Sequence, residues 1–322
     1  MYAVKPARIC YESASCDVRC WFRDALKVNK YYLINHTMEA YMKLTRILTA
    51  IAFVFAFSLV ALPETPEEMG YRIAKMNDDR PVFEKVKAKG TLVIYSSSGE
   101  EKFRKVILMG TYTSNMGAPN YCERYIAYFM APPDDQGNSY LMYHYKNQVD
   151  VKWAYLKGIR KAKKVTGADQ KLSFFGSDFS NADAQKPNFT QWNYKYIGDD
   201  KVEFRGKVFD CYMIESLPKT NSIKSDQGCG RRVSFMEKKS LLTLRLDFYD
   251  ENMIKIKELR LLSFTTKNNI KGQKVNYETG LEMRNLKTGS KSQLLFSDLK
   301  TEEESNLRTD IYTEQYLTQK WW

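Results

Sequence analysis

Side chains that commonly carry out catalysis are scarce in this sequence. Of its two histidines, only His144 lies beyond the apolar stretch at residues 47–62. His144 stands between Tyr143 and Tyr145 in a strand-like segment, where a lone histidine is more often structural than catalytic. A Ser/His/Asp triad would depend on this residue, and no Gly-x-Ser-x-Gly elbow occurs in the sequence. We therefore expect that the protein is not an enzyme.

Ligands for a metal or a phosphate group are equally sparse. Three cysteines lie near the start of the chain, at Cys10, Cys16 and Cys20. Their spacing suggests metal ligation, but no matching pair or histidine completes a site. The adjacent acidic pairs Asp134-Asp135 and Asp199-Asp200 are better explained by turns than by acid–base chemistry, and there is no glycine-rich phosphate loop. We expect neither a metal nor a cofactor.

Residues 42–62 have the features of a secretory signal peptide. Lys43 and Arg46 form a basic start, and an uncharged apolar run follows as far as Leu62, with Ala61 in a position suited to cleavage. The run is shorter than the ~20 residues that a membrane-spanning helix needs. We expect export to the periplasm. The alternative is that this segment stays in place as an uncleaved anchor.

Residues 1–41 precede the signal, although a signal peptide normally begins the chain. We interpret them as an upstream extension, which is not translated if synthesis starts at Met38 or Met42. The fold is then expected to occupy residues 63–322 as a single domain.

Three cysteines remain in that domain, and export would permit a disulfide. We favour the pair Cys211–Cys229, whose closed loop would stabilise the fold by about 3 kcal/mol in the chain-entropy view. Cys122 is then left unpaired.

The formal net charge is +12, which favours contact with anionic surfaces such as lipid headgroups or nucleic acid. The same charge also fits a soluble surface that happens to be basic. Residues 157–164 carry Arg160 and four lysines beside Trp153 and Tyr155, a combination that can bind single-stranded nucleic acid. The export signal argues against that partner. We expect transient contact with a membrane surface and no nucleic acid.

Beyond residue 62 the sequence predicts one helix followed by many strands. Residues 63–79 form the helix, because Met69, Ile73 and Met76 are spaced along one helical face and glutamates favour its start. From residue 91 the apolar residues alternate with a period of two, which is typical of half-buried strands. About eleven consecutive antiparallel strands without an internal boundary favour one sheet.

The alternation also predicts that this sheet has an apolar face and is bent. One predicted strand carries four apolar residues in a single phase, at Leu242, Leu244, Leu246 and Phe248. In the next strand the apolar phase changes by one residue between Ile256 and Leu259, which marks a bulge. The predicted fold class is mainly β (α+β): one strongly curved antiparallel sheet that forms an unclosed barrel, covered by a few helices.

Residues 151–183 contain the most distinctive motif. A strand with Trp153 and Tyr155 on one face leads into a Lys157-Gly158 turn and a basic return strand. Further on, Gly176-Ser177-Asp178-Phe179 precedes a capping-box spacing of Ser180 and Asp183. We interpret Asp178 as a local cap, or alternatively as a hinge or contact of a covering segment.

This motif resembles the core motif of the LolA-like outer-membrane lipoprotein-sorting proteins of Gram-negative bacteria. The residues that carry the resemblance are Trp153, Tyr155, Leu156, Arg160, Gly176, Ser177, Asp178 and Phe179. The resemblance extends through residues 285–289 to Tyr316 and Leu317, and covers residues 64–318.

The resemblance implies a periplasmic carrier without cofactor. Its unclosed barrel would hold lipoprotein acyl chains or other lipids in a hydrophobic cavity and shuttle them toward the outer membrane. An inner-membrane transporter of the RND type would be the partner. The alternative is a periplasmic protein-binding or envelope-stress-sensing module with a filled core.

Strand phase provides candidates for the wall of the cavity. They are Val151, Trp153, Tyr155, Phe174, Leu242, Leu244, Leu246 and Phe248. The sequence does not determine which phase faces inward.

Overall fold

The computed structural model describes residues 37–47, 49 and 63–322, except for residues 117, 119, 147, 185 and 187. The chain divides into two units, Met1–Pro63 and Glu64–Trp322. In the first unit, residues 37–47 are helical. The upstream extension and most of the predicted signal peptide lie outside the described residues. In the described part of the chain, no helix is long and apolar enough to cross a membrane.

The second unit consists mainly of strands. Its helices are α2 (Pro66–Asp78) and α3 (Asn221–Gln227), with short 3-10 turns η1 (Lys157–Ile159), η2 (Gly167–Lys171), η3 (Phe189–Gln191), η4 (Glu302–Ser305) and η5 (Glu314–Leu317). The strands are β1 (Lys85–Tyr95), β2 (Glu101–Ser114), β3 (Cys122–Ala131), β4 (Ser139–Tyr145), β5 (Val151–Leu156), β6 (Lys161–Lys164), β7 (Trp192–Phe204), β8 (Lys207–Pro218), β9 (Arg231–Glu237), β10 (Thr243–Tyr249), β11 (Lys255–Asn268), β12 (Lys274–Asn285) and β13 (Lys291–Thr301).

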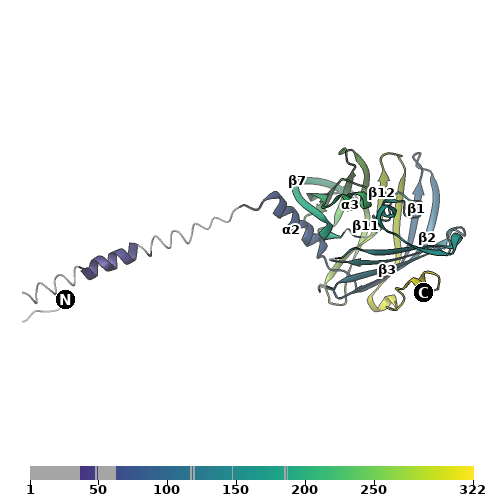
Figure 1. Ribbon diagram of the computed structural model, residues 1–322, viewed down its shortest axis with the longest axis horizontal. Coiled ribbons are helices and arrows are strands. Elements are labelled where there is room, and N and C mark those ends of the chain that lie inside the picture. Colours follow the sequence, from purple (N-terminus) through teal and green to yellow (C-terminus); the bar gives the residue numbers. More distant parts are fainter. Residues whose placement is uncertain are drawn as a thin grey trace, which may run out of the picture. The chain divides into compact units, whose positions relative to one another are not determined.

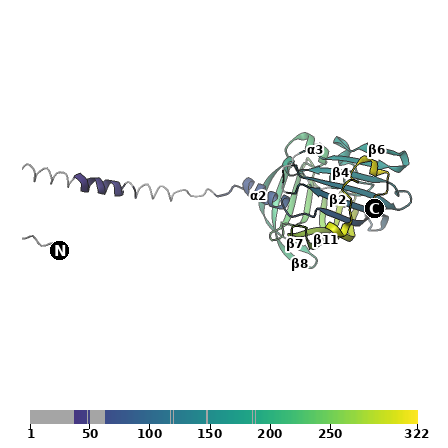
Figure 2. The same ribbon diagram turned by 90° about the horizontal axis from the view of Figure 1, so that it is seen from below.

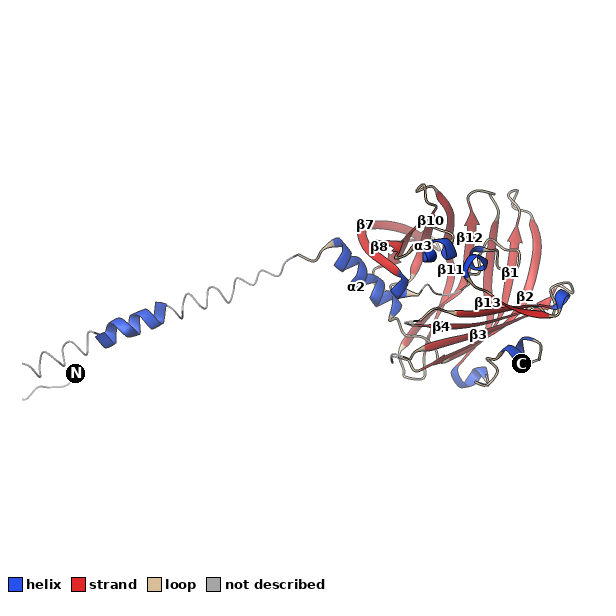
Figure 3. Cartoon of the chain, in the orientation of Figure 1, coloured by secondary structure: helices blue, strands red, loops and turns tan. Residues whose placement is uncertain are grey.

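All of these strands belong to one 13-stranded sheet in the order β6-β5-β4-β3-β2-β1-β13-β12-β11-β10-β9-β8-β7. Neighbouring strands pair in antiparallel fashion, and β6 and β7 remain as free edges. Figures 1 and 3 show the sheet bent into an open shell. The predicted fold class, a curved antiparallel sheet that does not close into a barrel, is therefore confirmed.

Bulges account for part of the bending. In β11, Lys255 pairs with Tyr249 and Lys257 pairs with Phe248, so Ile256 is the extra residue. This bulge lies where the change of apolar phase predicts one. In β7, Gly198 has φ 129° at a shift of register, and the strand continues through it. The sequence suggests a break there, but glycine's freedom at positive φ lets one long strand turn instead.

The outer face of β10–β12 is covered by charge pairs. Asp247, Glu258 and Glu282 are almost fully buried, although none of them lies in an apolar cluster. Arg245 and Lys255 neutralise Asp247 at 3.1 and 2.9 Å, and Arg284 neutralises Glu282 at 2.6 Å. Long arginine and lysine stems shield the carboxylates from water. This part of the outer face therefore needs no further cover.

The outer face of β2–β6 is instead covered by the C-terminal segment, residues 306–322. Ile311, Leu317 and Trp321 of this segment pack against Ile126 of β3 and Leu141 of β4. Figures 1 and 2 show the segment beside these strands. Its irregular backbone is anchored to the sheet, because Ser139 Oγ donates a hydrogen bond to the carbonyl of Leu317 at 2.6 Å.

Helix α2 lies on the inner face of β7–β9. Thr65 caps it through a reciprocal capping box with Glu68, which explains why the helix begins at Pro66. Ile73 and Ala74 pack against Ile214 of β8 and Met236 of β9.

The contact between α2 and β7 depends on Gly70. A Cβ atom at this position would overlap the backbone of Lys195 and Tyr196. We predict that Gly70→Ala lowers the free energy of unfolding by about 1–3 kcal/mol, because the helix must move off the strand. Urea denaturation would measure the change. Gly158→Ala is the control, because nothing lies within 4 Å of that position, and equal effects of both changes would contradict the prediction.

Candidate functional site: a cavity under the curved sheet

A cavity of about 440 Å³ lies on the concave side of the sheet. Side chains from the inner phase of most strands line it, and its wall is mainly apolar. The apolar lining includes Val86, Leu92, Ile107, Met109, Ala127, Met142, Phe174, Phe179, Leu246, Leu259, Leu281, Leu294 and Phe296. This volume lies within the range of small-molecule sites, ~300–1,000 Å³. The concave face is therefore only partly filled by its own side chains.

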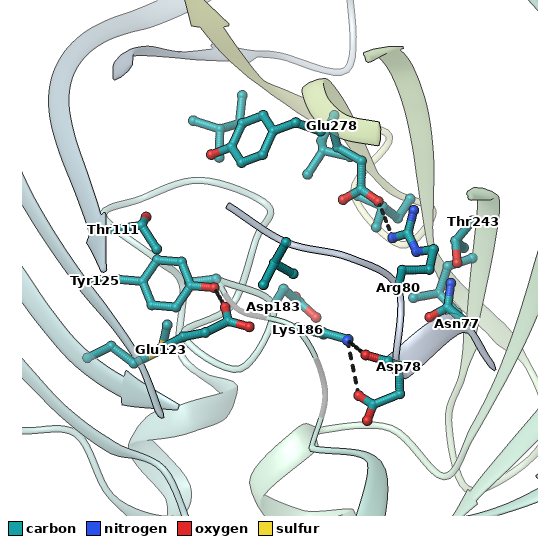
Figure 4. A pocket seen from close by; sticks show the side chains of 18 of the residues that line it. Asn77, Asp78, Arg80, Thr111, Glu123, Tyr125, Asp183, Lys186, Thr243 and Glu278 are labelled. Carbon is teal, nitrogen blue, oxygen red and sulfur yellow. Dashed lines mark hydrogen bonds and ion pairs between the residues drawn. The ribbon is translucent and has the colours of Figure 1, made fainter. Parts of the chain in front are cut away.

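Polar side chains interrupt the apolar wall at separate points (Figure 4). Glu123 of β3 is 5% exposed and accepts hydrogen bonds from the hydroxyl groups of Tyr121 and Tyr125. Burial together with this charge raises the pKa of Tyr125 well above its usual value. This end of the cavity therefore holds a carboxylate that is stabilised by phenol donors.

The end of α2 and the linker that follows it, residues 77–83, line one side of the cavity and are held by polar contacts. Arg80 pairs with Glu278 of β12 at 3.1 Å, and Lys186 pairs with the Asp78 carboxylate at 3.0 Å (Figure 4). Asn269 donates a hydrogen bond to the carbonyl of Val82 at 3.0 Å. The linker is thus held to the sheet, and the end of α2 is held to Lys186.

A covering segment, residues 165–191, lies on the inner side of the sheet and supplies Phe174, Phe179 and Asp183 to the cavity wall. Phe174 and Phe179 belong to the core and join through a hydrogen bond from the Phe174 amide to the Phe179 carbonyl at 2.7 Å. Between them Gly176 has φ 81°, a conformation that glycine adopts at little cost. The glycine of the Gly-Ser-Asp-Phe motif thus allows a tight loop that points two aromatic rings at the sheet.

Polar contacts fasten this segment to distant strands. The Asp178 carboxylate accepts hydrogen bonds from Ser290 Oγ and Ser292 Oγ, at 2.6 and 2.7 Å. Lys105 of β2 donates to the carbonyl of Phe175 at 2.9 Å. The second interpretation of Asp178, as a contact of the covering segment, is therefore confirmed over a local cap.

Lys152 of β5 makes a further fastening from the inner face. Its side chain is 1% exposed, and Nζ donates to Gln170 Oε1 at 2.9 Å and to the Asn181 carbonyl at 3.1 Å. Burial lowers the pKa of Lys152 to about 8, although the charges of Asp150 and Asp183 oppose this shift. The described residues give it no carboxylate in direct contact.

Five side chains of the cavity wall carry buried polar groups without a hydrogen-bond partner among the described residues. These groups are Nε and Nη1 of Arg80, Nε of Arg232, Nε1 of Trp192, and the hydroxyl groups of Thr111 and Tyr140. An unsatisfied buried donor costs ~1–3 kcal/mol. The cavity therefore combines an apolar wall with donors that a bound molecule can use.

Several solved structures have a fold similar to this one. A DUF1329 family protein from Desulfovibrio piger superposes with a TM-score of 0.66 and 24% identity, over 79% of this chain and 99% of that one. A putative outer membrane lipoprotein-sorting protein domain from Vibrio parahaemolyticus superposes with a TM-score of 0.66 and 19% identity, over 79% of this chain and 100% of that one. A LolA superfamily protein from Nitrosomonas europaea superposes with a TM-score of 0.52 and 18% identity, over 77% of this chain and 99% of that one.

A family model described as an uncharacterized protein matches residues 122–319. The chain belongs to this family, and its fold is LolA-like. No curated protein matches the sequence significantly. The resemblance that the motif at residues 151–183 suggests is therefore confirmed at the level of the fold family.

Two of the eight predicted wall residues line the cavity, namely Phe174 and Leu246. Leu242 and Leu244 belong instead to a separate cluster with Val202 and Phe204. A shift of register between Thr243 and Arg245 separates these leucines from Leu246. The sequence of β10 alternates regularly, so it does not show that the inward-facing phase changes within the strand.

Phe248, Val151, Trp153 and Tyr155 also lie outside the lining. Phe248 is 2% exposed and is covered by other side chains. Trp153 and Tyr155 pack on the outer face, beneath the C-terminal segment, and Val151 has the same phase in β5. The inner phase of β5 is that of Lys152. The prediction that these aromatic residues face the cavity is therefore wrong, because a distant segment covers the other face.

Two further predictions are corrected. Cys211 and Cys229 are free, as is Cys122. Cys211 of β8 pairs with Glu237 at the end of β9, whereas Cys229 precedes the start of β9, so the two cysteines are not opposite each other. The turn after β5 is η1, and the residue with positive φ there is Arg160 (φ 50°), not Gly158.

His144 has a structural environment. It is 4% exposed and lies 3.0 Å from Asp150 Oδ1. Burial acts to lower its pKa, but the hydrogen bond and charge of Asp150, with Glu123, outweigh burial and raise it. Among the described residues, no group of three His, Cys, Asp or Glu side chains is arranged for a metal.

Sequence reasoning missed three of the charged residues that line the cavity, Arg80, Glu123 and Arg232. Arg232 and Glu123 occupy inner positions of strands where alternation alone leads one to expect apolar residues. A charged residue in the strand phase that faces inward could have revealed them. The sequence alone, however, does not show which phase faces inward.

The Asp178 contact gives a direct prediction about the covering segment. Asp178→Ala removes the acceptor for both serines, so amide hydrogen exchange should accelerate at residues 174–181 by about tenfold, and the sheet should keep its protection. Asp210→Ala, an exposed position, is the control. Unchanged exchange at residues 174–181 in Asp178→Ala would show that the serine contacts do not hold the segment.

Lys152 gives a prediction about pH. Its pKa is about 8 in the folded protein and ~10.4 in an unfolded chain, so between these values the unfolded state binds more protons. The free energy of unfolding therefore gains from Lys152 as pH rises through this window, by about 1 kcal/mol per pH unit. Lys152→Met should lose that gain, and exposed Lys161→Met should retain it. Urea denaturation across the window tests this, and parallel pH profiles for wild type and Lys152→Met would contradict it.

Proposed function

We propose that this LolA-like protein is an extracytoplasmic carrier that holds an acyl chain of a lipid or lipoprotein in its cavity. The single observation that carries the proposal is the apolar cavity of about 440 Å³ between the curved sheet and its cover. An acyl chain that leaves water for such a wall is stabilised by ~0.8 kcal/mol per CH₂ group. Hydrophobic burial alone is therefore sufficient for binding.

The cover supports transient loading. Asp178, Lys152 and Lys105 hold the covering segment mainly through hydrogen bonds, each with a net contribution of ~0.5–1.5 kcal/mol, and more where a charge takes part. Such contacts can open without loss of the sheet. The carrier needs no catalysis, and any energy for release must come from a partner in the membrane. We propose an inner-membrane transporter of the RND type as that partner, and the outer membrane as the destination.

The rival function is a periplasmic protein-binding or stress-sensing module with a filled core. A concave face filled by its own leucines and phenylalanines would favour that module. The size of the cavity favours carriage instead. Native mass spectrometry of protein purified without detergent separates the two functions, because a carrier is expected to retain a lipid or acyl peptide.

Two neighbouring leucines on β13 provide a matched test. Leu294 lines the cavity, and Leu295 has the opposite phase and does not. We predict that Leu294→Trp weakens binding of a fluorescent fatty acid by about tenfold, because the larger side chain fills the cavity. Leu295→Trp should leave affinity within about twofold. Equal affinities for both variants, or no binding by the wild type, would refute carriage in this cavity.

A further inference from the structure

The register of the sheet places two cations beside Phe248, Arg232 of the cavity wall and Lys257 of β11. Ser216 of β8 pairs with Arg232 of β9, Arg232 with Phe248 of β10, and Phe248 with Lys257 of β11. The Arg232 guanidinium lies 5.1 Å from the Phe248 ring centre, and Lys257 Nζ lies 5.0 Å from it. Both cations therefore lie near the ring of Phe248, which is itself almost fully buried.

One carboxylate reaches these cations from the covering segment. Asp183 is in contact with Lys257 Nζ at 2.5 Å, and its carboxylate also accepts from Ser180. Burial opposes its ionisation, but the charges of Lys257 and Arg232 hold the pKa of Asp183 below its usual value. Asp183 lines the cavity, as Figure 4 shows. The sheet thus offers an anion site that a carboxylate of the protein itself partly occupies.

The charge of Asp183 leaves a donor of the Arg232 guanidinium without a hydrogen-bond partner. Arg232 is 4% exposed and lines the cavity, and its Nη2 donates to Gln227 at 2.6 Å, whereas its Nε has no partner. The guanidinium lies 4.3 Å from the ring centre of Trp192, whose Nε1 is also buried without a partner. Two cations and one carboxylate leave this cluster of contacting residues with a charge of +1. A buried cation is expected to be paired, so a further anion is the group that fits.

We propose that Arg232, with Trp192 and Lys257, forms a subsite for the anionic head of an amphiphile, a phosphate or a carboxylate, whose chain occupies the apolar cavity. This inference rests on the proposed carrier function and names its ligand class. Asp183 shares the site before the ligand arrives. The incoming anion competes with Asp183 for the cations and so weakens the hold of the sheet on the covering segment.

Single-chain amphiphiles that share one acyl chain test this subsite on the purified full-length chain. Lysophosphatidic acid carries the phosphate, monoacylglycerol lacks it, and inorganic phosphate lacks the chain. Dissociation constants are measured below the critical micelle concentration. The wild type should bind lysophosphatidic acid at least about tenfold more tightly than monoacylglycerol, and inorganic phosphate far more weakly than either.

Variants identify the residues responsible. Arg232→Gln should bring the affinities for the two amphiphiles within about twofold of each other, because the loss falls mainly on lysophosphatidic acid. Arg231→Gln is the matched control, because Arg231 is the next residue of β9 and pairs with Glu215 at 2.5 Å on the other face. Asp183→Asn removes the competing carboxylate and should tighten lysophosphatidic acid binding by about threefold or more. A protein that is merely destabilised would not show that gain.

The outcomes separate the subsite from the carrier function. Equal wild-type affinity for both amphiphiles, or a phosphate preference that Arg232→Gln and Asp183→Asn leave unchanged, overturns the subsite and leaves carriage intact. Inorganic phosphate that binds as tightly as lysophosphatidic acid overturns the amphiphile as ligand. No binding of either amphiphile by the wild type overturns the carrier function and the subsite together.

Discussion

The structure depends on how the two faces of one large sheet are removed from water. The outer face of β2–β6 receives the C-terminal segment, which packs closely through Ile311 and Leu317. The inner face is concave, so α2 and the covering segment reach its sides and leave its centre open. Sheet curvature, helped by bulges such as the one at Ile256, therefore creates the cavity. A flat sheet with the same cover would have a filled core.

Because the cover cannot pack tightly over an open centre, polar contacts at its margin hold it. The hydrogen bonds of Asp178, Lys105 and Lys152 and the ion pair of Asp183 together are worth roughly 4–8 kcal/mol. An acyl chain of about twelve CH₂ groups gains ~10 kcal/mol on burial. The gain from a long chain is thus comparable to the hold of the whole cover, and a short chain cannot offset it.

Local patterns in the sequence predict the strands, the curvature and the bulge, because each depends on alternation over a few residues. They do not predict which face points inward. Trp153 and Tyr155 look like cavity residues, but the C-terminal segment some 150 residues later covers their face. Lys152 looks like a solvent-facing residue and is buried by Gln170 and Asn181. In both cases burial is decided by a segment far away in the sequence or by the register between strands, and neither can be read from a single strand.

The net positive charge of the protein lies outside the cavity, so it bears on solubility and not on ligand recognition. The lining of the cavity, where it is described, contains three cations and four carboxylates, so the net charge of +12 is carried elsewhere. Part of it lies on β6, an edge strand that pairs only with β5 and has exposed Lys161, Lys163 and Lys164. Lysines on a free edge hinder pairing with the edge of another molecule. The basic strand therefore has a structural explanation that needs no binding partner, and selectivity for a ligand depends on the few buried charges around Arg232.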